Sequence, residues 1–233
     1  IYLKEYFMFG YLEYDGDNFD KDINCRCIVL CSDGKHFCAG ANFGKDRDMQ
    51  DKADPYSELY TQAVRLFKNK KPVIAAVQGG AIGGGLGLSL VADFRIGCPE
   101  SRFSANFSRL GFHQGFGTTV TLPRVVGPQN AAMMMLTGRR LKGQEAFDVG
   151  LIDYLVPLNE VRSKAIELAE EISESGPLAI QSIRATIRAG LAEQVEEIVS
   201  WELSEQVRLQ STKDFKEGIK ASLERRKPKF EGS

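Results

Sequence analysis

The chain has 233 residues, of which 43% are hydrophobic and 26% are charged, with 30 Lys and Arg against 31 Asp and Glu. This length and composition suit one α/β domain with a substantial core. A net charge of −1 gives no overall basic field, and no apolar run approaches the roughly 18 residues of a membrane span, so we expect neither nucleic acid nor a membrane as a partner.

The first part of the chain predicts one short strand between two helices. Residues 1–20 are aromatic and acidic, and we expect one short helix there. A strand is expected over Cys27–Cys31, and the Ser-Asp-Gly-Lys sequence at 32–35 predicts the turn that follows it. Lys45–Pro55 is highly charged and has no apolar stripe, which favours a solvated loop or a lid. Helical periodicity is clear over Ser57–Phe67.

The five cysteines indicate buried, reduced thiols. Cys25, Cys27 and Cys31 alternate along the predicted strand, so we expect them to share one buried face as small hydrophobic residues. A zinc site is the alternative, but no CxxC pair is present, and His36 and His113 lie at no ligand spacing. We therefore expect no metal, and a cytoplasmic or organelle-matrix protein that opens with no signal-peptide pattern.

The stretch from Lys71 to Asp93 reads KPVIAAVQGGAIGGGLGLSLVAD. Its short apolar run, Val73–Val77, is bounded by breakers and predicts a buried strand. Five glycines follow, and Leu86–Ala92 is expected to form one or two helical turns. Free amides at such a helix N-terminus suit an anion, or a carbonyl oxygen that is becoming one.

Several interpretations of this glycine cluster compete. A P-loop needs a Lys-Ser/Thr pair where Leu86-Gly87 stands, and a dinucleotide fingerprint needs a GxGxxG register that the stretch does not supply. An oxyanion hole needs backbone that approaches a ligand so closely that no Cβ is tolerated. The remaining alternative is a tight turn that only allows close helix packing.

The rest of the chain predicts short alternating elements and then a helical region. In chain order, the expected elements are a strand at 94–98, extended chain at 103–110, a glycine-bracketed turn at 111–117, helices at 118–125, 127–136 and 142–149, and a strand at 151–156. From residue 159 the composition favours almost continuous amphipathic helix, broken at Gly176-Pro177, near Gly190 and near Ser211-Thr212. We therefore divide the chain into a core over 1–158 and a helical region over 159–233.

Four motifs within residues 25–230 are specific in combination. They are CRCIVL…GKHFCAGANF, KKPVIAAVQGGAIGGGLGLSLVADFRI, LPRVVG…AMMMLTGRRLKGQEAFDVGLIDYLV and FKEGIKASLERRKPKF. Together they resemble the crotonase superfamily, that is, the enoyl-CoA hydratase/isomerase family. The resemblance implies an α/β spiral of ββα units with a C-terminal helical trimerisation region. It also implies an acyl-CoA or acyl-carrier thioester as substrate, no cofactor beyond the CoA of the substrate, and a homotrimer or hexamer.

The resemblance assigns roles to individual positions. The backbone amides of Ala41 and Gly84 would bind the thioester oxygen, with Gly83 beside them, and Ala39 would meet the adenine end of CoA. Two preorganised donors of this kind stabilise the negative oxygen of an enolate. At the C-terminus, Ser222 and Arg225 occupy places where relatives have an aromatic residue and a Lys that touch CoA. A cation contact from Arg225 is therefore expected, without stacking.

The chain departs from the family where a hydratase carries its two glutamates. Gly87 and Phe107 stand at those positions, and neither side chain can carry a proton. We therefore expect both residues to bind substrate rather than to hydrate it. The turn after them, which lines the acyl pocket in this superfamily, contains Phe112 and His113. His113 either carries a proton near neutral pH or bonds a neighbouring backbone group and holds the turn.

These departures leave three functional hypotheses. The first is an enoyl-CoA hydratase/isomerase-like enzyme, a lyase or isomerase, that stabilises an enolate. The RFSANFSRLGF segment also looks like that of decarboxylating crotonases, so a decarboxylase or C–C hydrolase is an alternative, with Lys45, Arg47 and Arg109 as candidate cations. The third hypothesis is a catalytically silent binding or assembly subunit. For His36 we expect a structural role.

Overall fold

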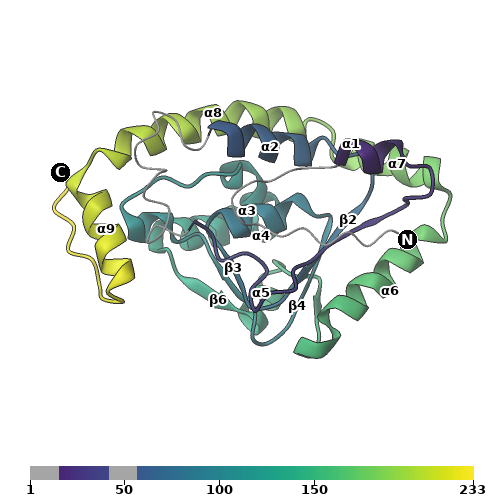
Figure 1. Ribbon diagram of the computed structural model, residues 1–233, viewed down its shortest axis with the longest axis horizontal. Helices are drawn as coiled ribbons and strands as arrows, with labels where there is room; N and C mark the ends of the chain where they lie inside the picture. The colour runs from purple at the N-terminus through teal and green to yellow at the C-terminus, as the bar shows by residue number, and fades with distance from the viewer. Residues whose placement is uncertain (1–15, 42–56) are drawn as a thin grey trace.

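The computed structural model describes residues 16–41 and 57–233. Its larger sheet has four parallel strands in the order β1-β2-β4-β7, of which β2 and β4 are labelled in Figure 1. These strands are β1 (Ile28–Leu30), β2 (Val73–Val77), β4 (Phe94–Gly97) and β7 (Tyr154–Leu155). β2 is central and every residue in it is buried, as expected for a strand that is covered on both faces.

The smaller sheet carries the glycine cluster. It contains β3 (Gly80–Ile82), β5 (Arg102–Ser104) and β6 (Arg140–Lys142). β3 pairs with β5 in parallel, and β5 pairs with β6 in the antiparallel sense. An isolated parallel bridge joins Cys38 to Ala81, so residues far apart in sequence meet along β3.

Alternate residues of β2 face two hydrophobic clusters, as the period-two geometry of a strand requires. Ile74 and Ala76 pack in a cluster that includes residues of α6 (Val161–Ser173). Val73, Ala75 and Val77 belong to the larger cluster, to which α2, α3, α4 and α8 contribute. The helical region after residue 158 therefore supplies part of the main core.

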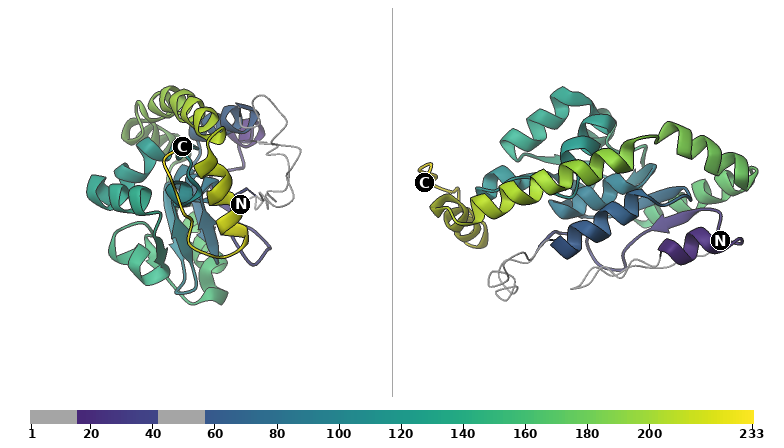
Figure 2. Two further views of the ribbon diagram at one scale, coloured as in Figure 1. Left: turned by 90° about the vertical axis from the view of Figure 1, so that its left-hand side faces the viewer. Right: turned by 90° about the horizontal axis from the view of Figure 1, so that it is seen from above.

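The helices cover both faces of the larger sheet. Before residue 158 they are α1 (Gly16–Lys21), α2 (Ser57–Phe67), α3 (Gly84–Val91), the 3-10 helix η2 (Asn106–Leu110), α4 (Thr118–Thr137) and α5 (Gly143–Asp148). The 3-10 helix η3 (Leu158–Glu160), α6, α7 (Pro177–Ile187), α8 (Leu191–Gln210) and α9 (Lys213–Leu223) follow. The long helix α8 runs along one side of the molecule with α2 beside it (Figure 1; Figure 2).

Most of the predicted elements are confirmed, and two need correction. Residues 103–110 were expected to be extended, but β5 ends at Ser104 and η2 begins at Asn106. The chain turns at Ala105, and Gly111 in the left-handed conformation ends η2, with its N–H bonded to Phe107 and Ser108 carbonyls. The strand predicted at 151–156 shortens to β7, because Leu151 and Ile152 donate to the Ala146 carbonyl instead of a neighbouring strand.

The prediction for the cysteines is confirmed only in part. All five are buried, and none forms a disulfide within the described residues. Cys27 and Cys31 share the cluster that faces α6, whereas Cys25 lies in the larger cluster, because its N–H closes a turn onto the Asp22 carbonyl at 3.1 Å and the alternation of the strand does not reach it. The helix expected within 1–20 corresponds to α1, while the rest of that segment and Lys45–Pro55 lie outside the described residues.

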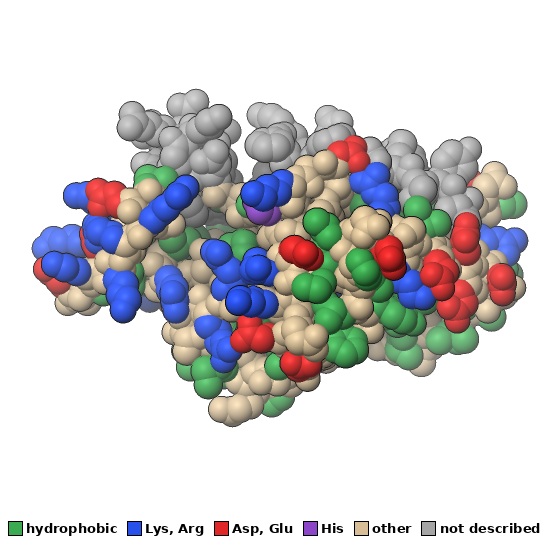
Figure 3. All heavy atoms as spheres, turned by 90° about the horizontal axis from the view of Figure 1, so that it is seen from below, with side chains coloured by type: hydrophobic (Ala, Val, Ile, Leu, Met, Phe, Trp, Pro, Cys, Tyr) green, Lys and Arg blue, Asp and Glu red, His purple; other side chains and the backbone are tan. Residues whose placement is uncertain are grey.

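Charged side chains are unevenly distributed over the surface. Lys and Arg side chains dominate the half of one face that lies on the side of α9 (Figure 3). Among the helices of residues 16–41 and 57–233, none has the length and apolarity that crossing a bilayer requires.

Candidate active site

The glycine turn places one backbone amide at the edge of open space. Gly83 has φ 57° and caps α3, and its own N–H bonds the Ser104 carbonyl at 2.9 Å. The N–H groups of Leu86 and Gly87 return to the Gly83 carbonyl. Within the described residues no acceptor takes the N–H of Gly84, the first residue of α3, and a Cβ at Gly84 would meet nothing within 4 Å. This N–H is therefore available to a ligand.

The Cys38–Ala41 segment lies against this turn. The Cys38 N–H bonds the Gly80 carbonyl at 2.9 Å, and the Ile82 N–H bonds the Cys38 carbonyl at 3.0 Å. A Cβ on Gly85 would lie only 2.1 Å from that Cys38 carbonyl oxygen. Glycine is therefore required at 85 so that the two backbones can approach.

Gly40 allows the backbone between Ala39 and Ala41 to pass close to Ile82. It has φ 83°, and a Cβ there would lie 2.8 Å from the Ile82 carbonyl oxygen. Ala39 and Ala41 on either side of it are exposed, and no described residue accepts a hydrogen bond from the Ala41 N–H. The two predicted oxyanion residues thus lie on segments that are hydrogen-bonded to each other.

His36 has the structural role that was expected of it. Its Nδ1 accepts a hydrogen bond from the Gly80 N–H at 3.0 Å. A ring nitrogen that accepts carries no proton, so His36 is held in one tautomer against the start of β3.

Aromatic side chains form the wall beside the turn. The Phe107 ring comes within 3.7 Å of the Cβ position of Gly83. Phe107 and Phe112 have ring centroids 6.3 Å apart, and Phe112 and Phe215 have centroids 5.1 Å apart. All three are buried. The structure thus brings Phe107 and Phe112 to the predicted site, where they offer an apolar surface and no proton carrier.

His113 is partly exposed and bonds its own loop. Its Nδ1 lies 2.8 Å from the Gln114 carbonyl oxygen. Because a carbonyl oxygen only accepts, Nδ1 must carry the proton, and Nε2 of the neutral ring then has the free lone pair. The turn-holding contact that was the alternative for His113 is present, and it uses Nδ1 and not Nε2.

A buried polar network that the sequence analysis missed holds the same loop. The Glu202 side chain on α8 is fully buried and accepts from the Gly117 N–H at 2.7 Å, the Thr119 N–H at 3.0 Å and the Thr119 hydroxyl at 2.6 Å. One turn further along α8, the Gln206 Nε2 donates to the His113 carbonyl at 2.9 Å. Burial raises the pKa of Glu202. Its signal in the sequence is its register, because the buried positions of α8 include 195, 199, 202 and 206.

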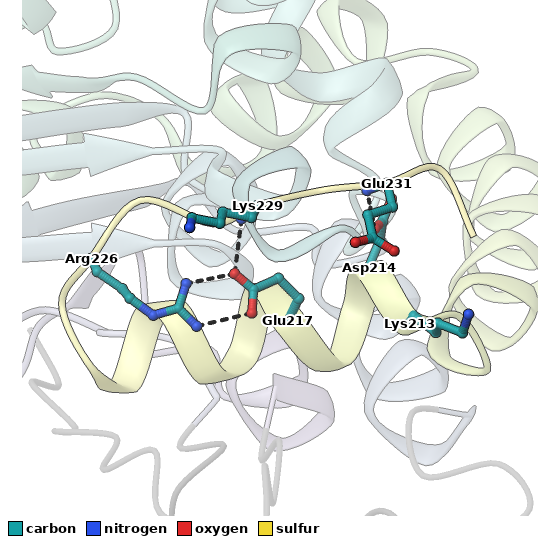
Figure 4. A pocket seen from close by; sticks show the side chains of 6 residues that line it. All are labelled: Lys213, Asp214, Glu217, Arg226, Lys229 and Glu231. Atoms are coloured by element: carbon teal, nitrogen blue, oxygen red, sulfur yellow. Dashed lines mark hydrogen bonds and ion pairs between the residues drawn. The ribbon is translucent and has the colours of Figure 1, made fainter.

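The C-terminal segment folds back along α9 and closes a separate, charged pocket (Figure 4). Arg226 makes a two-pronged ion pair with Glu217, with Nη1–Oε1 at 2.5 Å and Nη2–Oε2 at 2.9 Å. The Asp214 carboxylate accepts from the backbone N–H groups of Glu231 and Gly232, each at 2.8 Å. None of the predicted site residues lines this pocket.

The predicted site residues thus fall into two groups. Gly83, Gly84, Gly87, Phe107 and Phe112 meet at the glycine turn, with Ala39 and Ala41 on the adjoining segment and His113 next to Phe112. Arg225 is apart from these residues and exposed beyond the end of α9. In the described part of the chain, no group of His, Cys, Asp and Glu residues could hold a metal ion.

Comparisons with known proteins agree on one family. A family model described as enoyl-CoA hydratase/isomerase matches residues 17–233. A crotonyl-CoA hydratase of Syntrophomonas wolfei is 34% identical over 205 residues, which are 87% of this chain and 79% of the relative. An enoyl-CoA hydratase of Mycobacterium tuberculosis is 33% identical over 223 residues, 92% of this chain and 83% of the relative. A crystal structure of an enoyl-CoA hydratase/isomerase from Pseudoalteromonas atlantica superposes with a TM-score of 0.83 at 25% identity, covering 93% of this chain and 86% of that one.

Proposed function

Since the chain belongs to the enoyl-CoA hydratase/isomerase family, we propose that it is an acyl-CoA enzyme in which the amides of Ala41 and Gly84 stabilise the enolate of a thioester. Removal of a proton beside a thioester carbonyl places the negative charge on its oxygen. A fixed N–H donor aimed at such an oxygen contributes about 2.7–4 kcal/mol to catalysis. The relatives' names favour this class of enzyme over a decarboxylase, a C–C hydrolase or a silent subunit.

One observation carries this proposal. The Gly84 N–H has no acceptor among the described residues, borders open space, and lies on a turn to which the Cys38–Ala41 segment is hydrogen-bonded. A turn that served only for packing would require glycine where the backbones touch, as at Gly85. It would not require an unfilled space at Gly84.

We assign the proton transfer to His113. Its Nε2 has the lone pair, since Nδ1 bonds the Gln114 carbonyl. Gly87 and Phe107 stand where the resemblance places the paired glutamates of a hydratase, and Phe107 lines the turn with an aromatic ring. Hydration through two carboxylates is therefore not part of the proposal. Isomerisation of a double bond needs only an enolate and one proton carrier, and it fits these groups better.

The substrate in this proposal carries its own CoA, and the protein needs no further cofactor. Ala39 would meet the adenine end, and the exposed Arg225 would meet the phosphates. The basic half of the face on the side of α9 supports this assignment (Figure 3), because CoA is strongly anionic. Five buried cysteines without a disulfide among the described residues support a cytoplasmic or organelle-matrix location.

We also propose a homo-oligomer, a trimer or a hexamer. Large apolar side chains are exposed on α7, where Leu178, Ile183 and Ile187 are 81%, 58% and 66% exposed, and on α8, where Trp201 is 62% exposed. Such apolar surface is typical of an interface between protein chains. A second copy of the chain would cover it.

The experiment that tests the proposed function removes the N–H of Gly84. Gly84 is the first residue of α3, where proline is well tolerated, so Gly84→Pro deletes the donor while keeping the helix. Gly84→Ala is the matched control, because it adds a Cβ but keeps the N–H. The measurement is exchange of the α-protons of butyryl-CoA for deuterium in D₂O, followed by mass spectrometry.

We expect exchange with the wild-type protein and with Gly84→Ala, and a rate roughly 10²–10³ lower with Gly84→Pro. Circular dichroism checks that the variants are folded. Equal rates for all three proteins would contradict the role of Gly84. The absence of exchange by folded wild-type protein would favour the silent subunit.

A further inference from the structure

Asn106 has a polar side chain at the glycine turn that makes no hydrogen bond to another described residue. It is the first residue of η2, and its Oδ1 lies 3.5 Å from the Cβ position of Gly83, the residue next to Gly84. The side chain is partly exposed. Sequence analysis missed it because asparagine in a turn is usually a local backbone partner.

Aromatic side chains lie beside Asn106 at the glycine turn. Phe107 follows it and contacts the same glycine, and Phe112 and Phe215 continue the aromatic wall. Because Asn106 is partly exposed, solvent water can hydrogen-bond its carboxamide when no ligand is bound. A substrate held by the Gly84 amide would displace that water, and an acyl chain of hydrocarbon alone would leave the carboxamide without a partner. Such a site discriminates strongly against ligands that lack the hydrogen-bonding group.

The polar group on the substrate should be neutral. A carboxamide both donates and accepts, so it matches a hydroxyl or a keto oxygen. A carboxylate would require a cation nearby. On η2 the cationic side chain is Arg109, which is exposed and whose Nε donates to the Thr137 carbonyl at 2.8 Å, directed at the end of α4.

We propose that Asn106 determines specificity, and that the acyl group of the substrate carries a hydroxyl or keto oxygen close to its thioester. This inference rests on the proposed function, because it takes the Gly84 amide as the anchor of the thioester. Asn106 cannot take up a proton as a carboxylate does, so it does not replace a hydratase glutamate. Its contribution is to bind and orient the acyl group beside the oxyanion amides.

Binding measurements separate this inference from the proposed function. The probes for isothermal titration calorimetry are butyryl-CoA, 3-hydroxybutyryl-CoA and succinyl-CoA, which differ in the acyl group alone. Chromatography after each titration confirms that the ligand is unchanged. We expect wild-type protein to bind 3-hydroxybutyryl-CoA at least roughly tenfold more tightly than butyryl-CoA. Succinyl-CoA should bind no better than butyryl-CoA.

Asn106→Leu removes the hydrogen-bonding groups at nearly constant volume, and Asn106→Ala is the second variant should leucine disturb the fold. Each should lose the preference for the hydroxylated ligand while keeping its affinity for butyryl-CoA. Asn159→Leu, the same change at an exposed position of η3, should leave the preference unchanged.

The negative outcomes are distinct. Equal wild-type affinities for the hydroxylated and plain ligands would overturn the inference and leave the proposed function standing. A preference that survives both Asn106 variants would do the same. If succinyl-CoA bound most tightly of the three, the inference that the polar group of the acyl chain is neutral would be wrong. Failure to bind any of the three thioesters would remove the proposed function itself.

Discussion

Gly87 and Phe116 compete for one volume. A Cβ built on Gly87 would lie 2.6 Å from the Phe116 Cβ and 2.8 Å from its Cγ and Cδ1. Phe116 is 1% exposed and adopts φ 64°, a backbone conformation that is uncommon for a residue other than glycine. The position at which the resemblance places a hydratase glutamate is therefore closed by an aromatic ring from the loop after His113. With the Phe116 ring in this place, no side chain fits at position 87, so the absence of the glutamate and the presence of the ring go together.

Restoring the acid alone should therefore fail. Gly87→Glu forces a Cβ against the Cβ of Phe116, which is tied to the backbone and cannot rotate away. We expect a free energy of unfolding lower by about 1–3 kcal/mol, and no gain in hydration of crotonyl-CoA. Chemical denaturation and absorbance of the enoyl thioester measure the two quantities.

A second substitution makes this prediction specific to the pair. Phe116→Ala opens the volume, so the double variant Gly87→Glu, Phe116→Ala should lose less stability than the two single variants added together. Additive losses would mean that the two residues do not compete. Phe103→Ala, at a fully buried ring in β5, gives an additive reference.

The buried cysteines should be unreactive until the chain unfolds. Burial raises the pKa of Cys27 to about 12 and also raises the pKa of Cys25 and Cys38. Because the thiolate is the reactive form, native protein should react with a disulfide reagent at mildly alkaline pH roughly 100-fold more slowly than a free thiol. In concentrated guanidinium chloride all five should react at once. A fast-reacting thiol in the native protein would contradict the described burial.

Asp93 should be among the most sensitive charged positions. Its carboxylate accepts from the Val73 N–H at 2.8 Å, the Arg184 Nε at 2.8 Å and the Arg188 Nη1 at 2.9 Å, and it ties α7 to the larger sheet. Asp93→Ala leaves two largely buried guanidinium groups without their carboxylate. We expect a loss of about 3–5 kcal/mol in the free energy of unfolding. Asp148→Ala removes an exposed carboxylate whose one hydrogen bond within residues 16–41 and 57–233 is to Gln144. It should change the free energy of unfolding by less than about 0.5 kcal/mol.

Local patterns predicted much of the fold. The run Val73–Val77 and the helix Ser57–Phe67 carry unambiguous periodicities, and both match β2 and α2 at each end. The expectation for residues 103–110 was wrong because its apolar residues suit a strand, whereas Ala105 and Gly111 adopt turn conformations that no periodicity reveals. Gly127 was predicted to separate two helices, and this is confirmed, because its non-helical backbone (φ 77°, ψ 158°) divides α4 into two helical segments.

The candidate site was predicted where glycines mark a close approach of backbones, and missed where partners lie far apart in sequence. Cys38 pairs with Ala81, and each of these residues lies in a motif of small residues that can be recognised in the sequence. The contact of Glu202 with the N–H of Gly117 spans 85 positions, and no local pattern encodes it. Asn106 was missed for a different reason, because its significance lies in having no hydrogen-bond partner among the described residues.

The pH dependence of stability should reveal Glu202. Burial raises its pKa above the ordinary value of 4.5, so the folded protein binds a proton more readily than the unfolded chain. The contribution of Glu202 to stability is then fully present at a pH below its pKa in the unfolded chain. It is lost as the pH rises through its raised pKa in the folded protein. Denaturant titrations across this range measure the free energy of unfolding of wild-type protein and Glu202→Gln. The difference between the two should shrink as the pH rises.

At low pH the free energy of unfolding of Glu202→Gln should also be lower than that of wild-type protein by about 1–3 kcal/mol. In the wild-type protein each carboxyl oxygen accepts a hydrogen bond from one backbone N–H, whereas the NH₂ group of glutamine faces one of these donors and cannot accept. Glu205→Gln, three residues along α8, is the matched control. Its pairing with Arg208 lowers the pKa of Glu205, so its contribution has the opposite sign and is lost as the pH falls. A wild-type minus Glu202→Gln difference that is flat across the range would mean that folding does not raise the pKa of Glu202. A difference that grows as the pH rises would mean that the folded protein favours the carboxylate, which then holds the loop after His113.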